Sequence, residues 1–226
     1  MSFRADGEHL VIDLPGATAL FTTRRGGVSQ GPYASLNLGL LTDDEPDRVA
    51  SNRERVRAHA GAERLAQGRQ VHGTRVVVDG QGGEEADGQV TTRPGVAAIV
   101  LVADCLPVAL AGPAAAGVVH AGWRGLSNGV LEAGVAAVGD PGHVAAAIGP
   151  GIGPCCYEVG DDVRAVFGTS ARTLDLKAVA RARLHDVGVN EVHDCGLCTA
   201  CDAERFFSHR RDRGLTGRQA GLAWRS

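Results

Sequence analysis

The sequence has 226 residues, of which 44% are apolar and 22% are charged, and its formal net charge at pH 7 is −3. A chain of this length can bury one substantial hydrophobic core, and this balance of residue types excludes disorder over most of the length. The small negative net charge provides no basic surface for nucleic acid or an anionic membrane, so neither is an expected partner.

The N-terminal residues and the cysteines indicate the compartment. The N-terminus has no apolar stretch behind basic residues, as a secretory signal would, and no run approaches the roughly 18 apolar residues of a membrane helix. We therefore expect a cytoplasmic protein whose six cysteines are thiols, metal ligands or core residues.

The first ninety residues are predicted to hold short strands, loops and one helix. Apolar residues over 10–23 favour short strands broken by a proline, and the glycines over 25–33 are typical of a loop. Acidic residues around a proline predict a helix start at 43–46. The glycines and acidic residues of 80–88 predict an exposed loop.

The centre of the chain carries the clearest pattern. Val96 to Val102 is a continuous apolar run, typical of a strand that is buried on both faces, and a second run over 117–119 ends at His120. Three further elements are predicted, namely a helix over 126–138, a strand over 143–148 and a helix over 176–187 that a glycine ends. With no internal repeat and no interdomain linker, residues 1–226 are expected to form a single domain of mixed strands and helices.

Three potential metal ligands, His72, Cys105 and His120, each lie at a strand end or tight turn. Imidazole and thiolate suit Zn²⁺, and three protein ligands leave a fourth position for water or substrate, as in a catalytic zinc site. Their spacing matches no metal-binding motif. A histidine beside glycines is also commonly a plain loop residue, and a buried strand-end cysteine is commonly a core thiol. The residues alone leave both interpretations open.

Nine short blocks occur together and in order. They are Gly-Gly-Val-Ser at 26–29, Ser-Leu-Asn-Leu-Gly at 35–39, Asn-Arg at 52–53, Gln-Val-His-Gly at 70–73, Ala-Asp-Cys-Leu-Pro at 103–107, His-Ala-Gly-Trp-Arg-Gly at 120–125, Ile-Gly-Pro at 148–150, Tyr-Glu-Val at 157–159 and Phe-Phe-Ser at 206–208. Over about residues 20–224, this pattern closely resembles the polyphenol oxidoreductase (laccase)-type family, also called the purine nucleoside phosphorylase or peptidoglycan editing factor family.

The resemblance implies a fold, a metal and an activity. The fold would be α+β, a single domain of mixed β-sheets flanked by helices. The metal ligands would be His72, Cys105 and His120, holding Zn²⁺, or Cu²⁺ by the affinity order of divalent ions. The activity would be phosphorolysis of adenosine, inosine and methylthioadenosine, together with deamination of adenosine. The partners are then a purine nucleoside and phosphate, and we predict no oligomeric state.

Four other residues are candidates for this chemistry. For deamination, zinc would supply an activated water, and Asp104 would protonate the leaving ammonia or else be a hydrogen-bonding carboxylate beside the ligand. For phosphorolysis, Arg53 and Arg124 would bind phosphate through their planar guanidinium groups, unless they form structural ion pairs. Asn37 would bind a substrate hydroxyl or cap a turn.

Three alternative functions use the same residues. Multicopper oxidation of phenols needs many histidines in close pairs, and the chain has eight histidines with no His-x-His, which disfavours it. A cysteine hydrolase or amidase acting on cell-wall precursors would use Cys105 as nucleophile and His120 or His72 as base. A zinc-dependent binding module is the non-enzymatic option, which an open coordination position and a deep cleft would disfavour.

The remaining cysteines suggest a second metal only superficially. Cys195, Cys198 and Cys201 form C-x₂-C-x₂-C, without a fourth cysteine at the expected distance, although Cys155 or Cys156 could approach in space. In the family that the chain resembles, this segment commonly carries Cys and Thr. We therefore expect no second metal, and we interpret the Cys-Cys pair as packed thiols in a turn.

Overall fold

Two six-stranded mixed sheets form the centre of the computed structural model, which describes residues 1–226. The first sheet has the strand order β1-β2-β3-β12-β7-β4, and only its β7–β4 pair is parallel. Its strands are β1 (Arg4–Asp6), β2 (His9–Leu14), β3 (Ala17–Phe21), β12 (Gln219–Arg225), β7 (Val96–Val102) and β4 (Arg64–Ala66).

The second sheet has the order β11-β10-β8-β9-β6-β5, with parallel pairs at its two edges and antiparallel pairs between. Its strands are β11 (Glu191–Asp194), β10 (Ala145–Ile148), β8 (Leu106–Ala111), β9 (Ala116–Ala121), β6 (Gly88–Thr91) and β5 (Val76–Val78). The α+β fold with mixed sheets, expected from the resemblance, is confirmed.

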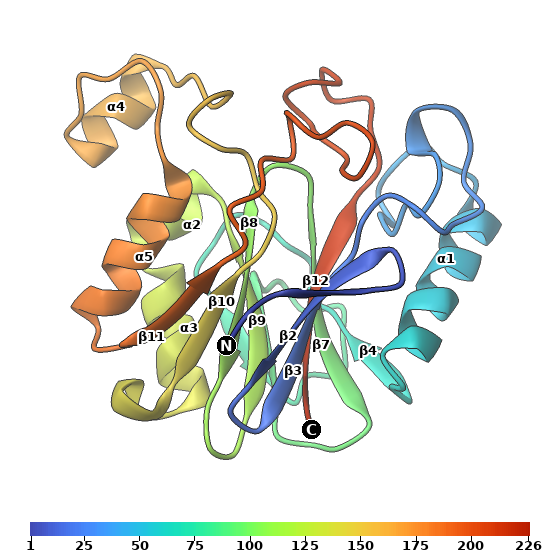
Figure 1. Cartoon of the computed structure of the whole chain (residues 1–226), viewed down its shortest axis with the longest axis horizontal. Coiled ribbons are helices and arrows are strands. Elements are labelled where there is room, and N and C mark those ends of the chain that lie inside the picture. The colour runs from blue at the N-terminus through green and yellow to red at the C-terminus, as the bar shows by residue number, and fades with distance from the viewer.

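Helices cover the outer face of each sheet (Figure 1). Helix α1 (Pro46–His59) packs on the first sheet. The second sheet is covered by α2 (Trp123–Asn128), α3 (Val130–Val138) and α5 (Leu176–Asp186), and α4 (Asp161–Phe167) packs beside α2. Short 3₁₀ helices lie at Gly31–Tyr33 and Pro141–His143. The layers are therefore helix, sheet, sheet, helix.

The alternation of side chains along each central strand explains these layers. In β7, Ala98 and Val100 point to the core between the sheets, whereas Ala97 and Ile99 point to the core under α1. The predicted strand over 96–102 is thus confirmed, including its burial on both faces. Most side chains between the sheets are alanine, so the two sheets approach closely.

Several predicted boundaries differ from the structure. The helix expected over 126–138 is two helices, separated at Gly129, whose φ of +95° is in the left-handed region. Strand β8 was not predicted, because its proline disfavours a strand assignment. The loop over 80–88 is only partly exposed, since Asp87 is completely buried just before β6.

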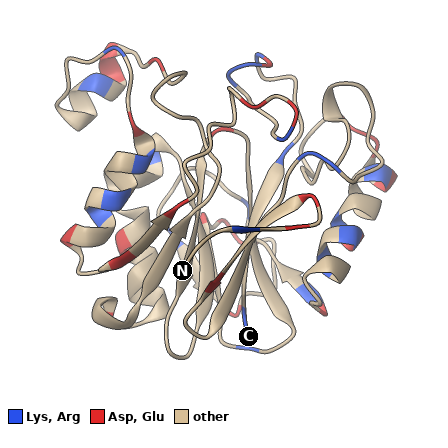
Figure 2. Ribbon diagram, viewed as in Figure 1, with Lys and Arg blue, Asp and Glu red and all other residues tan.

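Charged side chains are concentrated on the helices and connecting loops, and the strands carry few of them (Figure 2). This distribution agrees with sheets that are buried between two helical layers. None of the helices combines the length and the apolar character needed to cross a membrane.

Candidate metal centre

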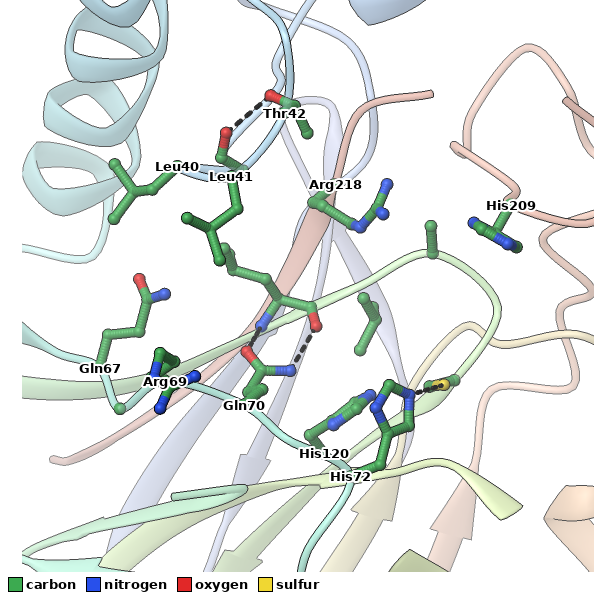
Figure 3. A pocket seen from close by; sticks show the side chains of 16 residues that line it. Leu40, Leu41, Thr42, Gln67, Arg69, Gln70, His72, His120, His209 and Arg218 are labelled. Atoms are coloured by element: carbon green, nitrogen blue, oxygen red, sulfur yellow. Dashed lines mark hydrogen bonds between the residues drawn. The ribbon is translucent and has the colours of Figure 1, made fainter. Parts of the chain in front are cut away.

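The three predicted ligands converge from three different elements. His72 lies in the loop after β4, Cys105 in the turn between β7 and β8, and His120 within β9. Pairing of β8 with β9 places the Cys105 turn beside the end of β9. The possible ligand atoms of the three side chains all lie within 4.8 Å of one another, and the His72 Nε2 to Cys105 Sγ distance is 3.9 Å (Figure 3).

The donor set fits a zinc ion. In a tetrahedral site, zinc lies about 2.3 Å from sulfur and about 2.0 Å from nitrogen, which places two nitrogen ligands roughly 3.3 Å apart and a nitrogen and a sulfur roughly 3.5 Å apart. The three side chains need only small movements to reach this geometry. Three protein ligands would leave the fourth position of a tetrahedral ion for water or substrate.

Asp87 holds two of the three ligands in place. Its carboxylate accepts hydrogen bonds from the backbone N–H groups of Val71, His72 and Gly73, at 3.0, 2.9 and 2.8 Å. It also accepts one from Nδ1 of His120 at 2.7 Å. Since a carboxylate only accepts, Nδ1 of His120 carries the proton and Nε2 is free to bind a metal.

Gly122 leaves the space that the ligands occupy. A Cβ atom on this residue would lie 3.0 Å from Sγ of Cys105 and 3.0 Å from Cδ2 of His72. Any larger residue would therefore press on both ligands. The glycine of the His-Ala-Gly-Trp-Arg-Gly block is thus required by the close packing of the site.

Two residues of the centre have unusual backbone conformations. His72 has a φ of +60° and Asp104, next to Cys105, has a φ of +88°. Residues other than glycine rarely adopt the left-handed region, and such conformations are concentrated at functional sites. Hydrogen bonds to Asp87 hold the loop that contains His72.

The electrostatics favour a thiolate beside an imidazolium when no metal is bound. Burial alone raises the pKa of Cys105, but the charge and hydrogen bond of His120 lower it to about 6. Burial lowers the pKa of His120, but the Cys105 thiolate and Asp87 raise it to about 9. The metal ligand form of Cys105, the thiolate, is therefore already stabilised by its neighbours.

A cavity of about 340 Å³ lies beside the three ligands (Figure 3). Small-molecule sites usually start at about 300 Å³, so this one accommodates a compact ligand. The lining comes from residues 39–42 and 67–70, the end of β7, the three ligands, His209 and Arg218.

Gln70 anchors the loop that carries His72 to strand β7. Its side-chain amide donates to the Leu101 carbonyl at 2.7 Å, and its carbonyl accepts from the Leu101 N–H at 2.8 Å. Both bonds are drawn in Figure 3. The loop is therefore fixed at one end by Gln70 and at the other by Asp87.

Arg218 and Arg69 are the cationic side chains of the cavity, and only Arg69 forms an ion pair, with Glu85. Arg218 donates through Nη1 to the carbonyls of Thr216 and Gly217, both at 3.0 Å, and it is half-buried. Burial lowers its pKa, while the charges of Cys105 and other neighbours raise it. An arginine without a carboxylate partner beside a cavity is suited to binding an anion.

The other four predicted residues do not line the cavity. Both oxygens of Asp104 are engaged, one by the Thr199 hydroxyl at 2.6 Å and one by the Arg210 N–H at 2.7 Å. Asn37 is completely buried, and its Oδ1 accepts from the N–H of Arg218 at 2.9 Å. Asn37 therefore fixes the main chain of Arg218, a cavity residue, without lining the cavity itself.

The two arginines predicted to bind phosphate lie elsewhere. Arg53, on α1, donates through Nη1 to the Leu38 carbonyl at 3.2 Å. The Arg124 guanidinium lies over the ring of Trp123, 4.4 Å from its centroid, and the residue is exposed. Neither arginine forms an ion pair with a carboxylate.

Comparison with known proteins identifies the family. The pattern of the multi-copper polyphenol oxidoreductase laccase family matches residues 18–226. The chain belongs to this family. Its relatives include a purine nucleoside phosphorylase of Pseudomonas aeruginosa, 42% identical over 91% of this chain and 92% of the relative. The purine nucleoside phosphorylase YfiH of Escherichia coli is 40% identical over 92% and 94% of the two chains.

Solved structures of two bacterial proteins share the fold. A Neisseria meningitidis protein matches with a TM-score of 0.89 and 39% identity, covering 97% of this chain and 99% of the other. The Bacillus licheniformis protein YfiH matches with a TM-score of 0.92 and 31% identity, covering 99% of both chains.

The histidines of the chain do not form the several copper sites that the laccase name of the family suggests. Only His72 and His120 of the eight histidines belong to a group that could hold a metal ion. Sequence reasoning missed Asp87 and Arg218, and it named Gln70 only as part of a block. For Asp87, the one signal is a single acidic residue directly before a strand.

Proposed function

We propose that the protein is a zinc-dependent purine nucleoside enzyme that catalyses phosphorolysis of adenosine, inosine and methylthioadenosine and deamination of adenosine. The observation that carries the proposal is the convergence of two imidazoles and one thiolate beside a cavity that also contains an arginine without an ion-pair partner. Relatives named purine nucleoside phosphorylase support it. In this proposal the protein works in the cytoplasm.

In phosphorolysis, a phosphate oxygen bonds to C1′ of the ribose while the bond from C1′ to the purine nitrogen breaks. The nitrogen keeps the electron pair and gains a proton, giving free base and ribose 1-phosphate. Arg218 would bind the phosphate, because a guanidinium forms charge-assisted hydrogen bonds with phosphate oxygens. Arg53 and Arg124, our sequence candidates, lie outside the cavity lining, so we assign this role to Arg218.

In deamination, water adds at C6 of adenosine and ammonia leaves. A zinc ion held by His72, Cys105 and His120 would supply the acidity that makes this water nucleophilic. Asp104 was predicted either as the acid for the leaving ammonia or as a hydrogen-bonding carboxylate. Its contacts with Thr199 and Arg210 favour the second role, in which it positions the Cys105 turn.

The proposal is tested with protein of measured metal content, incubated with adenosine and phosphate. Chromatography separates adenine, inosine and hypoxanthine. We expect adenine only when phosphate is present, and inosine with or without it. If fully zinc-loaded protein forms neither product, the proposed function is wrong.

Removing a ligand is the sharpest form of this test. We expect His72→Ala and Cys105→Ala each to lose the zinc of this centre and at least 100-fold in nucleoside turnover, because the remaining two ligands bind zinc weakly. His143→Ala, at an exposed histidine, is the matched control. Full turnover by a variant whose centre is verified to lack zinc would exclude a catalytic metal.

A second function is favoured by one observation. Asp87, His120 and Cys105 form a chain of carboxylate, imidazole and thiol, the arrangement of a cysteine hydrolase. Metal content and alkylation distinguish the two. Iodoacetamide labels Cys105 only when no metal binds the sulfur, whereas a nucleophilic Cys105 is labelled in the protein as purified. A copper ion on this thiolate would instead give intense visible absorption and an electron paramagnetic resonance signal.

A further inference from the structure

A second group of sulfur atoms lies outside the centre described above. The four-cysteine cluster consists of Cys155, Cys156, Cys198 and Cys201, whose sulfur atoms all lie within 4.8 Å of one another. The sulfurs of Cys155 and Cys156 are each 3.4 Å from that of Cys201. The cluster joins a turn after β10 to the segment after β11.

The spacing matches four ligands of one metal ion. With zinc–sulfur bonds of about 2.3 Å, the sulfurs of a tetrahedral four-thiolate site are about 3.8 Å apart. The two distances of 3.4 Å to the sulfur of Cys201 lie below this value, and the limit of 4.8 Å for the whole cluster lies above it. An iron–sulfur cluster would need inorganic sulfide between the thiolates, which would hold the cysteines farther apart.

The surrounding backbone is shaped to the sulfurs. The N–H of Gly153 donates to Sγ of Cys198 at 3.1 Å, the kind of hydrogen bond that stabilises a metal-bound thiolate. A Cβ atom at Gly153 would lie 3.3 Å from Sγ of Cys155 and 3.3 Å from Cβ of Cys198. A larger residue there would therefore crowd the cluster.

We propose that the four-cysteine cluster binds one Zn²⁺ in a closed structural site, distinct from the centre at His72, Cys105 and His120. Four thiolates fill the coordination sphere, so this ion binds no substrate. The proposal revises the expectation of a single metal. Cys155 and Cys201 are exposed, and Cys156 and Cys198 are half-buried against the core of the second sheet, so none of the four sulfur-bearing residues is fully buried.

A zinc ion in the four-cysteine cluster would also restrict the motion of the segments that hold the Cys105 turn. Thr199, next to a ligand of the cluster, donates its hydroxyl to Asp104 at 2.6 Å and its N–H to the Gly151 carbonyl at 3.1 Å. Ile152 donates its N–H to the Asp104 carbonyl at 2.8 Å. Zinc would thus tie together the two segments that hold Asp104, the neighbour of Cys105.

The test is zinc stoichiometry of the full chain purified without chelator, measured by inductively coupled plasma mass spectrometry. We expect two zinc ions per chain in the wild type, one in Cys201→Ser and one in His72→Ala. Cys195→Ser is the matched control and should keep two, because Cys195 belongs to the same C-x₂-C-x₂-C run but not to the cluster. The zinc of the four-cysteine cluster should remain in His72→Ala even though this variant lacks the other zinc. The cluster site is therefore tested independently of the proposed function.

A measurement on the wild-type protein covers the case in which Cys201→Ser does not fold. The four cysteines of the cluster should resist iodoacetamide until a chelator removes zinc, and peptide mass spectrometry identifies the sites. Labelling at equal rates with and without zinc would overturn the proposal. Wild-type protein with one zinc and a disulfide within the cluster, or with visible absorption from iron, would also overturn it.

Discussion

The guanidinium of Arg218 lies beside the cavity with no carboxylate to neutralise it, and its Nη1 donates only to the backbone carbonyls of Thr216 and Gly217. The backbone N–H of Arg218 donates to Oδ1 of the buried Asn37, which fixes the main chain at this position. A half-buried guanidinium has lost part of its hydration and gains more from an incoming anion than a mobile surface arginine does.

Replacing Arg218 tests its role in binding phosphate. We expect Arg218→Gln to raise the KM for phosphate about tenfold or more, because a hydrogen bond to a charged group contributes about 1.5 to 3 kcal/mol. Deamination, which needs no phosphate, should change much less. Arg172→Gln, at an exposed arginine, should leave both reactions unchanged. Equal loss of the two activities would show that Arg218 does not act through phosphate.

His9 gives the protein a pH-dependent stability. Its ring packs edge-on against His59, with ring centroids 5.1 Å apart. Burial, and then the charge of His59, lower its pKa from 6.5 to about 4 despite the opposite effect of Asp6. Between these values the unfolded chain binds more protons than the folded one, so the free energy of unfolding falls as the pH falls from 6.5 to 4.

The His9 contribution is isolated by comparing the wild type with His9→Gln in urea denaturation at several pH values. Between pH 6.5 and 4, we expect the free energy of unfolding of the wild type to fall by up to about 3 kcal/mol more than that of the variant. His143→Gln, at an exposed histidine, should behave as the wild type. Parallel pH curves for wild type and His9→Gln would contradict the assignment.

At the scale of elements, the loop between β4 and β5 is a rigid part of the site. Gln70 bonds to the backbone of β7, and Asp87 bonds to three consecutive N–H groups of the loop and to His120 on β9. One carboxylate therefore sets the distance between two metal ligands that come from separate elements.

Asp87→Asn should weaken zinc binding at the His72 centre about 10- to 100-fold. The amide group of asparagine has about the same size, but it cannot accept all four hydrogen bonds and carries no charge. Chelator competition, followed through the loss of nucleoside turnover, measures the affinity. Asp13→Asn is the control, since this exposed aspartate pairs only with Arg4 and Thr18. Unchanged affinity would show that Asp87 does not orient the ligands.

Elements with a strong local pattern were predictable from the sequence. The apolar run of β7 and the helix α5, ended at Gly188 with a φ of +95°, follow from hydrophobic pattern and capping alone. Strand β8 was missed because its proline disfavours a strand assignment. The break at Gly129 was missed because the apolar pattern continues across it.

The predictability of the site followed a similar division. His72, Cys105 and His120 were identified as ligands through the sequence blocks that resemble the family, and the structure brings them together. The side chain of Asp87 contacts a loop and a strand that are distant in the sequence, and Arg218 lies beside a cavity lined by distant segments. Local sequence pattern does not encode either arrangement. The assignment of Arg53 and Arg124 to phosphate relied on the chemistry of the guanidinium group, which does not fix where the side chain points.

At the scale of the whole molecule, the narrow space between the sheets is filled by small residues. Gly221 of β12 faces this space, and a Cβ there would lie only 2.6 Å from Cβ of Pro107 on β8. The sheets cannot separate locally to admit a methyl group without disturbing the alanines around it.

We expect Gly221→Ala to lower the free energy of unfolding by about 1 to 3 kcal/mol, since overpacking outweighs the gain from replacing a flexible glycine. Guanidinium denaturation measures the change. Gly142→Ala is the control, because its Cβ would meet only Asp140 Oδ1, at an ordinary 3.5 Å. Equal stabilities of the two variants would mean that the sheets adjust at little cost.

The position of β12 has a consequence for synthesis on the ribosome. Strand β12 lies between β3 and β7 in the middle of the first sheet, although almost two hundred residues separate it from β3. Until residues 219–225 leave the exit tunnel, β3 and β7 have no partner between them, and the backbone edges that bond to β12 stay unpaired. The first sheet can therefore form completely only after β12 has been synthesised. Arg218, which directly precedes β12, reaches the cavity in the same step.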